Sequence, residues 1–211
     1  MSSLETTTKR SRSAARVAAA AAALLLIALA AAAATPQAPA AEEALAAEMT
    51  GKYTGILVDT HAVYPRELAQ RLTVRLDRLT TEAEADRMAE ILRDRGHDAL
   101  EDELWKKDVG RIQIDQGLGY PIAAALAFEE EGMDRLVLVI TRPISIGEIF
   151  SASRSADYPF SVVALDLGED GEGSGELVVA AQLHFGDDGR LLVDEYGAVP
   201  LRILNVDRDS R

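Results

Sequence analysis

The sequence predicts an α+β fold that is mainly antiparallel β-structure, with about eight strands and one helical pair inserted after the second strand. Three observations lead to this prediction. Apolar and polar residues alternate at period 2 in most segments, short Gly- and Asp-rich turns join the late segments, and one region alone has helical spacing. Strands and helices do not alternate along the chain, which disfavours a doubly wound parallel sheet. Period 2 leaves a barrel-like sheet and a two-layer sheet as alternatives.

Residues 1–40 have the composition of a secretory signal peptide. Basic residues between positions 9 and 16 precede an uninterrupted apolar run at residues 17–34, and small residues at 38–40 offer a cleavage site. The alternative is an uncleaved membrane anchor, because the run is nearly long enough to span a bilayer. Most of the run is alanine, which buries little area, so the cleaved signal is favoured. We therefore expect an exported, periplasmic or secreted bacterial protein that has no membrane contact after cleavage.

The chain is acidic and has no cysteine. Its formal net charge is −13, and residues 1–40 hold more basic than acidic side chains. An acidic chain is repelled by nucleic-acid phosphates, so we expect no nucleic-acid partner. Export without cysteine implies a fold held without disulfides. We expect a flexible leader at residues 41–50, a single β-rich domain at 51–206 and a polar tail at 207–211.

Two half-buried strands are predicted ahead of the helical region. In the first, Leu57, Asp59 and His61 share one side, which we assign as the polar side. In the second, Arg71 and Arg75 lie on the polar side, opposite an alternating series of Leu and Val.

A capping box marks the start of the helical pair. Thr81 and Glu84 have the Thr-x-x-Glu spacing in which each side chain satisfies an open N–H of the first turn. Apolar residues follow at helical spacing, and Gly96 is placed to end the helix. Residues 97–107 predict a second short helix with Trp105 among its inward residues. We expect the pair to pack on the sheet or to close one end of it.

Residues 120–128 are predicted to form one strand with an alanine stripe. Ala123, Ala125 and Ala127 share one side, which indicates close approach of a bulky element such as the helical pair. Because Ala and Glu favour helix, a helix at residues 122–131 is the alternative. Glycines on both sides limit its length, which favours the strand.

A long hairpin near the middle of the sheet is predicted at residues 157–185. Residues 160–167 are apolar on both faces, which is typical of a strand covered on both sides. The odd positions of residues 177–185 are expected to face a core. The glycines at 168–175 predict the turn between them. An interior strand at 135–140 and further strands at 110–115, 191–193 and 199–206 complete the predicted sheet.

Four stretches carry a resemblance to other proteins. The motifs Arg142-Pro143-Ile144-Ser145 and Asp157-Tyr158-Pro159-Phe160, the acidic Gly-rich turn after Leu167 and the ending at residues 199–206 resemble a group of uncharacterised secreted bacterial proteins. The resemblance covers most of residues 51–206. It implies an exported domain and brings no known activity or catalytic residues.

The candidate ligand-binding residues are Asp59, His61, Arg71, Arg75 and His184. If the first two strands pair and the second imidazole lies nearby, these side chains would bring a carboxylate, two imidazoles and two guanidinium groups together. Such a set binds an anionic ligand or performs acid–base chemistry. The alternative is a solvated sheet face with cross-strand charge pairs.

No catalytic or metal motif is found in the sequence. A Gly-x-Ser-x-Gly elbow, a cysteine nucleophile and the Gly-rich phosphate signatures are absent. The acidic turn at 166–176 lacks the ligand spacing of an EF-hand, and no two histidines have ligand spacing within one element. We therefore expect no metal and no cofactor.

These observations leave three hypotheses for the function. The first is an exported, non-enzymatic domain that binds a small apolar ligand in a barrel or sheet cavity. The second is a structural or protein-interaction module of the cell envelope. The third, which is less favoured, is a hydrolase that uses Asp59, His61 and His184.

Overall fold

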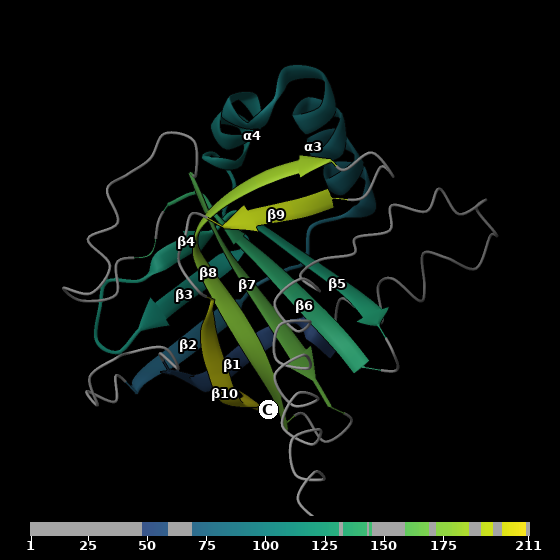
Figure 1. Ribbon diagram of the computed structural model, residues 1–211. Helices are drawn as coiled ribbons and strands as arrows, with labels where there is room; N and C mark the ends of the chain where they lie inside the picture. Colours follow the sequence, from purple (N-terminus) through teal and green to yellow (C-terminus); the bar gives the residue numbers. More distant parts are fainter. Residues whose placement is uncertain are drawn as a thin grey trace, which may run out of the picture.

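The computed structural model describes residues 48–58, 69–130, 133–142, 144, 159–168, 172–185, 191–195 and 200–209. Within these residues ten strands form one antiparallel sheet that is nearly closed and barrel-like, with two helices beside it (Figure 1). The predicted α+β class, the antiparallel pairing and the position of the helical pair are confirmed. The predicted signal peptide at 1–40 lies outside the described residues.

Each element has the following bounds. The strands are β1 (Gly51–Val58), β2 (Gln70–Leu76), β3 (Gly110–Ile114), β4 (Tyr120–Ile122), β5 (Ala124–Glu130), β6 (Met133–Ile140), β7 (Phe160–Leu167), β8 (Glu172–Phe185), β9 (Leu191–Glu195) and β10 (Leu201–Asp209). The helices are α3 (Glu82–Arg95) and α4 (His97–Leu104). The hydrogen-bonded order is β4-β3-β2-β1-β10-β8-β7-β6-β5, and β9 pairs with β8 beside this path.

The two edge strands of the sheet, β4 and β5, are consecutive in the chain and meet at a corner. The Val109 N–H donates to the Ile122 carbonyl at 2.8 Å, whereas the N–H of the next residue, Ala123, donates to the Val139 carbonyl at 2.8 Å. The chain therefore changes its strand partner between two successive residues. This corner divides the strand predicted at 120–128 into two, and it excludes the helical alternative for that segment.

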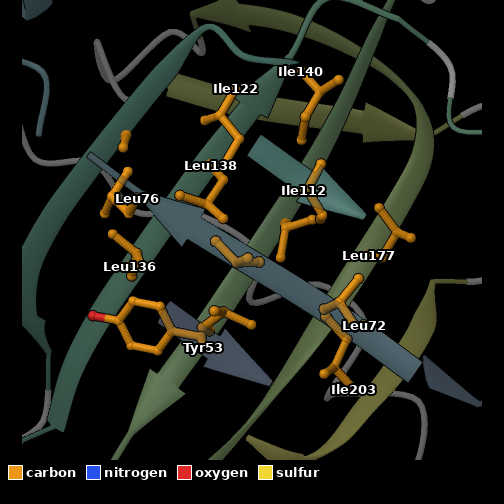
Figure 2. Packing of buried hydrophobic residues seen from close by; sticks show 14 of the residues in the cluster. Tyr53, Leu72, Leu76, Ile112, Ile122, Leu136, Leu138, Ile140, Leu177 and Ile203 are labelled. Atoms are coloured by element: carbon orange, nitrogen blue, oxygen red, sulfur yellow. The ribbon is translucent and has the colours of Figure 1, made fainter. Parts of the chain in front are cut away.

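Apolar side chains from around the sheet pack together in the barrel interior (Figure 2). Each labelled side chain in this core is at most 2% exposed. Full burial of a large apolar side chain contributes roughly 1.5–3 kcal/mol to stability, so this interior core is the main source of the stability of the barrel. The labelled residues are Tyr53, Leu72, Leu76, Ile112, Ile122, Leu136, Leu138, Ile140, Leu177 and Ile203.

The prediction for the two faces of the first strand was wrong. Leu57, assigned to the polar side, is 2% exposed and lies in the interior core, whereas Ile56 is 39% exposed. Tyr53 shares the inward side with Leu57, and its hydroxyl donates to the Met49 carbonyl at 2.6 Å. Because side chains alternate strictly along a strand, burial of this tyrosine fixes the direction of every other residue in β1.

Regular or buried structure extends slightly beyond both ends of the predicted domain. Met49, in the predicted leader, is 1% exposed and belongs to the interior core. At the other end β10 continues to Asp209, within the predicted polar tail.

The two helices pack on the outer side of β5, β6, β7 and β8, where they form a second apolar cluster. Leu100 and Leu104 of α4 are buried in it, but Trp105 is 53% exposed, so the inward placement predicted for Trp105 was wrong. Strands β6 and β7 are therefore buried on both faces, as the apolar runs at 135–140 and 160–167 predicted. The strand residues of the cluster include Ala124, Val137, Val139, Phe160, Val162, Ala164, Val178, Ala181 and Leu183.

The alanine stripe does not face the helices as predicted. Ala125 and Ala127 pack with the barrel interior. The helices contact the opposite side of β5, which carries the larger Leu126 and Phe128. Of the three alanines of the stripe, only Ala123, at the corner before β5, belongs to the helix-covered cluster.

The predicted capping box is present at the start of α3. The Glu84 N–H donates to Thr81 Oγ1 at 3.3 Å, and the Thr81 N–H donates to Glu84 Oε2 at 3.2 Å. Arg78 Nη1 and Lys107 Nζ also donate to this carboxylate, at 2.8 and 3.1 Å. The bond from Arg78 is the main reason that the pKa of Glu84 is lowered to about 2. The carboxylate thus links the end of β2, the start of α3 and the segment after α4.

Two glycines assigned to the hairpin turn lie in strand β8 instead. Gly173 and Gly175 pair with Leu167 and Leu165 of β7. An added Cβ would lie 2.0 Å from a backbone oxygen of β7 at Gly173 and 2.4 Å from the Ala164 carbonyl oxygen at Gly175. These glycines therefore allow two strand backbones to approach closely, which is a known role of glycine within strands.

Candidate functional site

A cleft of about 470 Å³ opens between the helical pair and the end of β8. The cleft is largely open to solvent, so a ligand would lie against its floor and would not be enclosed by it. The helical pair and the bent upper part of β8 lie side by side in Figure 1. The residues that line the cleft are Leu92, Arg93, Gly96, His97, Gln182, Leu183 and His184.

A bulge in β8 forms the strand wall of the cleft. Phe160 pairs with Ala181 and Val162 with Val178, so β8 holds one extra residue between these pairs. Before the bulge, Leu177 faces the barrel interior; after it, odd-numbered residues such as Ala181 face the helices. The odd positions of this strand were predicted to share one face, and the bulge overturns that prediction because the extra residue reverses the alternation. Gln182 and His184 alternate with these helix-facing residues and line the edge of the cleft.

The junction of the two helices forms the opposite wall. Gly96 alone separates α3 from α4, and its N–H donates to the Leu92 carbonyl at 3.1 Å. Its backbone angles, φ 80° and ψ −177°, lie in a region that is essentially restricted to glycine. This sharp connection places His97 at the mouth of the cleft.

His97 connects the two walls. Gln182 Nε2 lies 3.4 Å from His97 Nδ1, and His97 Nε2 lies 3.0 Å from Asp98 Oδ1. In the neutral imidazole with its proton on Nε2, that nitrogen donates to the Asp98 carboxylate and Nδ1 accepts from the Gln182 amide. The His97 side chain is 29% exposed, so it remains accessible to a ligand.

The cleft combines an apolar floor with a cationic and polar rim. Leu92 and Leu183 are 8% and 4% exposed and supply apolar surface. Arg93 supplies a permanent positive charge, and the two imidazoles donate or accept hydrogen bonds according to their protonation. The arrangement suits a small molecule with an apolar body and an anionic head. Across the described ranges, no three His, Asp or Glu side chains are grouped so that they can hold a metal ion.

The structure separates the residues that the sequence analysis combined. His184 lines the cleft, whereas Arg71 and Arg75 are exposed on the outer face of β2. Two strands, β1 and β10, lie between β2 and β8, so the structure does not bring the arginines to His184. Asp59 and His61 lie outside the described residues.

Sequence reasoning missed Arg93, His97 and Gln182. The position of His97 directly after the helix-ending Gly96 was the available signal, because a residue at such a junction lies at the end of both helices. Its contact with Gln182 joins residues 85 positions apart, which no local pattern indicates.

In the part of the chain that the structure describes, no helix has the length and apolar character needed to cross a membrane.

Comparison with known proteins gives no information about the function. No protein-family model, no curated protein and no solved structure matches the chain, so the function is argued from its own residues.

Proposed function

We propose that the protein is an exported, non-enzymatic domain that binds a small ligand in the cleft between the helical pair and β8. The ligand has an apolar body and an anionic head. The observation that carries this proposal is the cleft itself, whose leucine floor adjoins Arg93 and two of the three histidines of the chain. The proposal keeps the small apolar ligand predicted from the sequence and adds a head group.

The chemistry of the rim supports an anionic head. A carboxylate or phosphate accepts charge-assisted hydrogen bonds from a guanidinium group, and each such bond contributes roughly 1.5–3 kcal/mol. The two leucines contribute through the burial of apolar area on the ligand, at about 25 cal/mol per Å². A ligand that lacks either part loses one of these contributions.

Two parts of the proposal rest on the sequence: that the protein is exported, and that it has no catalytic activity. Export follows from the composition of residues 1–40. The hydrolase hypothesis requires Asp59 and His61, which lie outside the described residues, and it stays a prediction. The sequence prediction of a ligand within the barrel also stays a prediction.

Native mass spectrometry of the protein purified from an exporting host without detergent tests the proposal. A reproducible extra mass that is released on denaturation would support a bound ligand, and extraction would identify it. Titration with octanoate, followed by amide NMR, tests the site directly: shifts should concentrate at the residues that line the cleft. Octanol, which has the same chain without the charge, is the matched control. A clean apo mass together with no octanoate shifts at the cleft would overturn the proposal.

One observation favours the alternative of an envelope protein-interaction module. Ile56 of β1 and Leu204 of β10 pair directly across the sheet, and they are 39% and 41% exposed. They lie on an outer sheet face away from the cluster that the helices cover. Cross-linking in intact cell envelopes would test this alternative: a partner lost on Ile56→Ser substitution would favour it over ligand binding.

A further inference from the structure

Three cationic side chains lie side by side across β1, β2 and β3. Lys52 pairs with Arg75, and Arg75 pairs with Arg111, in the register of the sheet. The chain neighbours of Arg75 and Arg111 are buried, as is Tyr53 after Lys52, so these side chains lie on the outer face of the barrel. We call Lys52, Arg75 and Arg111 the cationic row.

The cationic row is unfavourable for the folded protein by itself. Like charges directly opposite each other on neighbouring strands are destabilising. The chain has 35 acidic and 22 basic residues, yet no acidic residue lies within the row. Lys52 Nζ contacts Asp209 Oδ2 at 3.0 Å at one end. Over the described part of the chain, Arg75 and Arg111 form no ion pair.

The surroundings of the row favour an extended anion. Thr54, Thr73 and Gln113 pair across the same three strands and form a neighbouring neutral row, in which the two threonine hydroxyls are donors and the Gln113 amide already donates to the Gly117 carbonyl at 2.8 Å. Strands lie about 4.8 Å apart, so the cationic row extends over roughly 10 Å. Gly119 leaves room for the Arg111 stem: an added Cβ there would lie 3.2 Å from its Cγ.

We propose that the cationic row binds a linear polyanion that carries phosphate groups. A chain lying across the strands contacts all three cations in succession, and its oxygens accept hydrogen bonds from the neutral row beside them. This site is on a different face from the cleft, so it goes beyond the function proposed above.

A narrow chain fits this surface better than a planar anionic membrane. The exposed Asp77 follows Arg75 by two residues, and Asp207 and Asp209 lie beside β1 on β10. A broad anionic surface would meet these carboxylates as well as the cations, whereas a chain one phosphate wide avoids them. The net acidic charge that disfavours a nucleic-acid partner also opposes polyanion binding here, and ionic screening beyond about 8 Å at physiological salt reduces that opposition at the row.

Titration of the purified protein with linear inorganic polyphosphate at several salt concentrations tests this proposal. Neutralising about three phosphates predicts a slope near −2 in a plot of log affinity against log salt, by analogy with single-stranded nucleic acids. Arg75→Gln should weaken binding about fivefold or more and reduce the size of this slope by about 0.7. Its melting temperature without polyphosphate should be at least that of the wild type, because a repulsive contact has been removed.

Arg202→Gln is the matched control. Arg202 is exposed on β10, outside the cationic row, and its substitution changes the net charge by the same amount. Binding by this variant should stay within about twofold of the wild type. Equal weakening by both substitutions would show a net-charge effect and would overturn the proposal. The proposal would also be overturned if the wild type does not bind polyphosphate. Binding to vesicles rich in phosphatidylglycerol without binding to polyphosphate would overturn it in the same way.

Discussion

Thr80 makes two hydrogen bonds with the main chain of Ala125. The Thr80 N–H donates to the Ala125 carbonyl at 2.8 Å, and the Ala125 N–H donates to Thr80 Oγ1 at 2.9 Å. Ala125 lies on β5, an edge strand of the sheet. A single residue between β2 and α3 thus provides the pairing that a neighbouring strand would provide, and it helps to close the barrel.

Thr80→Val should destabilise the protein by about 1–3 kcal/mol, because the Ala125 N–H loses its acceptor in a partly buried position. Chemical denaturation of the variant and the wild type measures this difference. Thr73→Val, in the middle of β2, is the control and should change stability by less than about 0.5 kcal/mol. Equal effects of both substitutions would contradict the role assigned to Thr80.

Gly175→Ala should destabilise the protein by about 2 kcal/mol or more. The new Cβ would lie 2.4 Å from the Ala164 carbonyl oxygen, so the two strand backbones must move apart. Thermal denaturation measures the loss. Ser174→Ala changes the neighbouring exposed residue of the same strand and should be nearly neutral. A Gly175→Ala variant with wild-type stability would show that the hairpin tolerates a side chain there.

Glu84→Gln should destabilise the protein at neutral pH by about 1 kcal/mol, a value reduced for solvent screening because the carboxylate is 26% exposed. The folded pKa of Glu84, about 2, lies below its ordinary value of 4.5. The ionised carboxylate therefore stabilises the fold above pH 4.5, and this contribution is lost as the pH falls from 4.5 towards 2.

Denaturation of both proteins between pH 7 and pH 2 measures this dependence. The stability difference between the wild type and Glu84→Gln should shrink as the pH falls below 4.5. Glu90→Gln, which removes the same charge from an exposed position on α3, is the matched control. A difference that stays constant down to pH 2 would contradict the assigned ionic network.

Arg93→Gln should weaken octanoate binding about tenfold, because the anionic head loses a charge-assisted hydrogen bond. Calorimetric titration measures the affinity. Arg87→Gln removes the same charge from an exposed residue of α3 outside the cleft, and it should leave the affinity within about twofold. Unchanged affinity in Arg93→Gln would exclude this guanidinium group from the binding site.

Local sequence patterns were sufficient for the main elements. The capping box of Thr81 and Glu84 was predicted because its two hydrogen bonds join residues three positions apart. The strands β6 and β7 were predicted to be covered on both sides because apolar residues occupy both of their faces. In each case the residues that determine the feature lie within one short segment of the chain.

The candidate site was only partly predictable. His184 was selected from the sequence and lines the cleft, but its predicted neighbours Arg71 and Arg75 are on another part of the sheet. Period 2 shows that a side chain is on a polar face, but it does not show which strands adjoin that face. The helix-end residue His97 became part of the site only because α4 packs beside β8.

The sequence by itself determined the β-rich class, the helical pair after the second strand, the covered strands and the cap of α3. Tertiary structure decided that Leu57 rather than Ile56 faces the interior core, that the sheet turns its corner at Ala123 and that a bulge turns Ala181 and Leu183 towards the helices. The physical reason is the range of the interactions. Helix caps and hydrophobic periodicity depend on residues a few positions apart. The face to which a strand side chain points, the closure of the barrel and the positions of bulges depend on which distant side chains pack together.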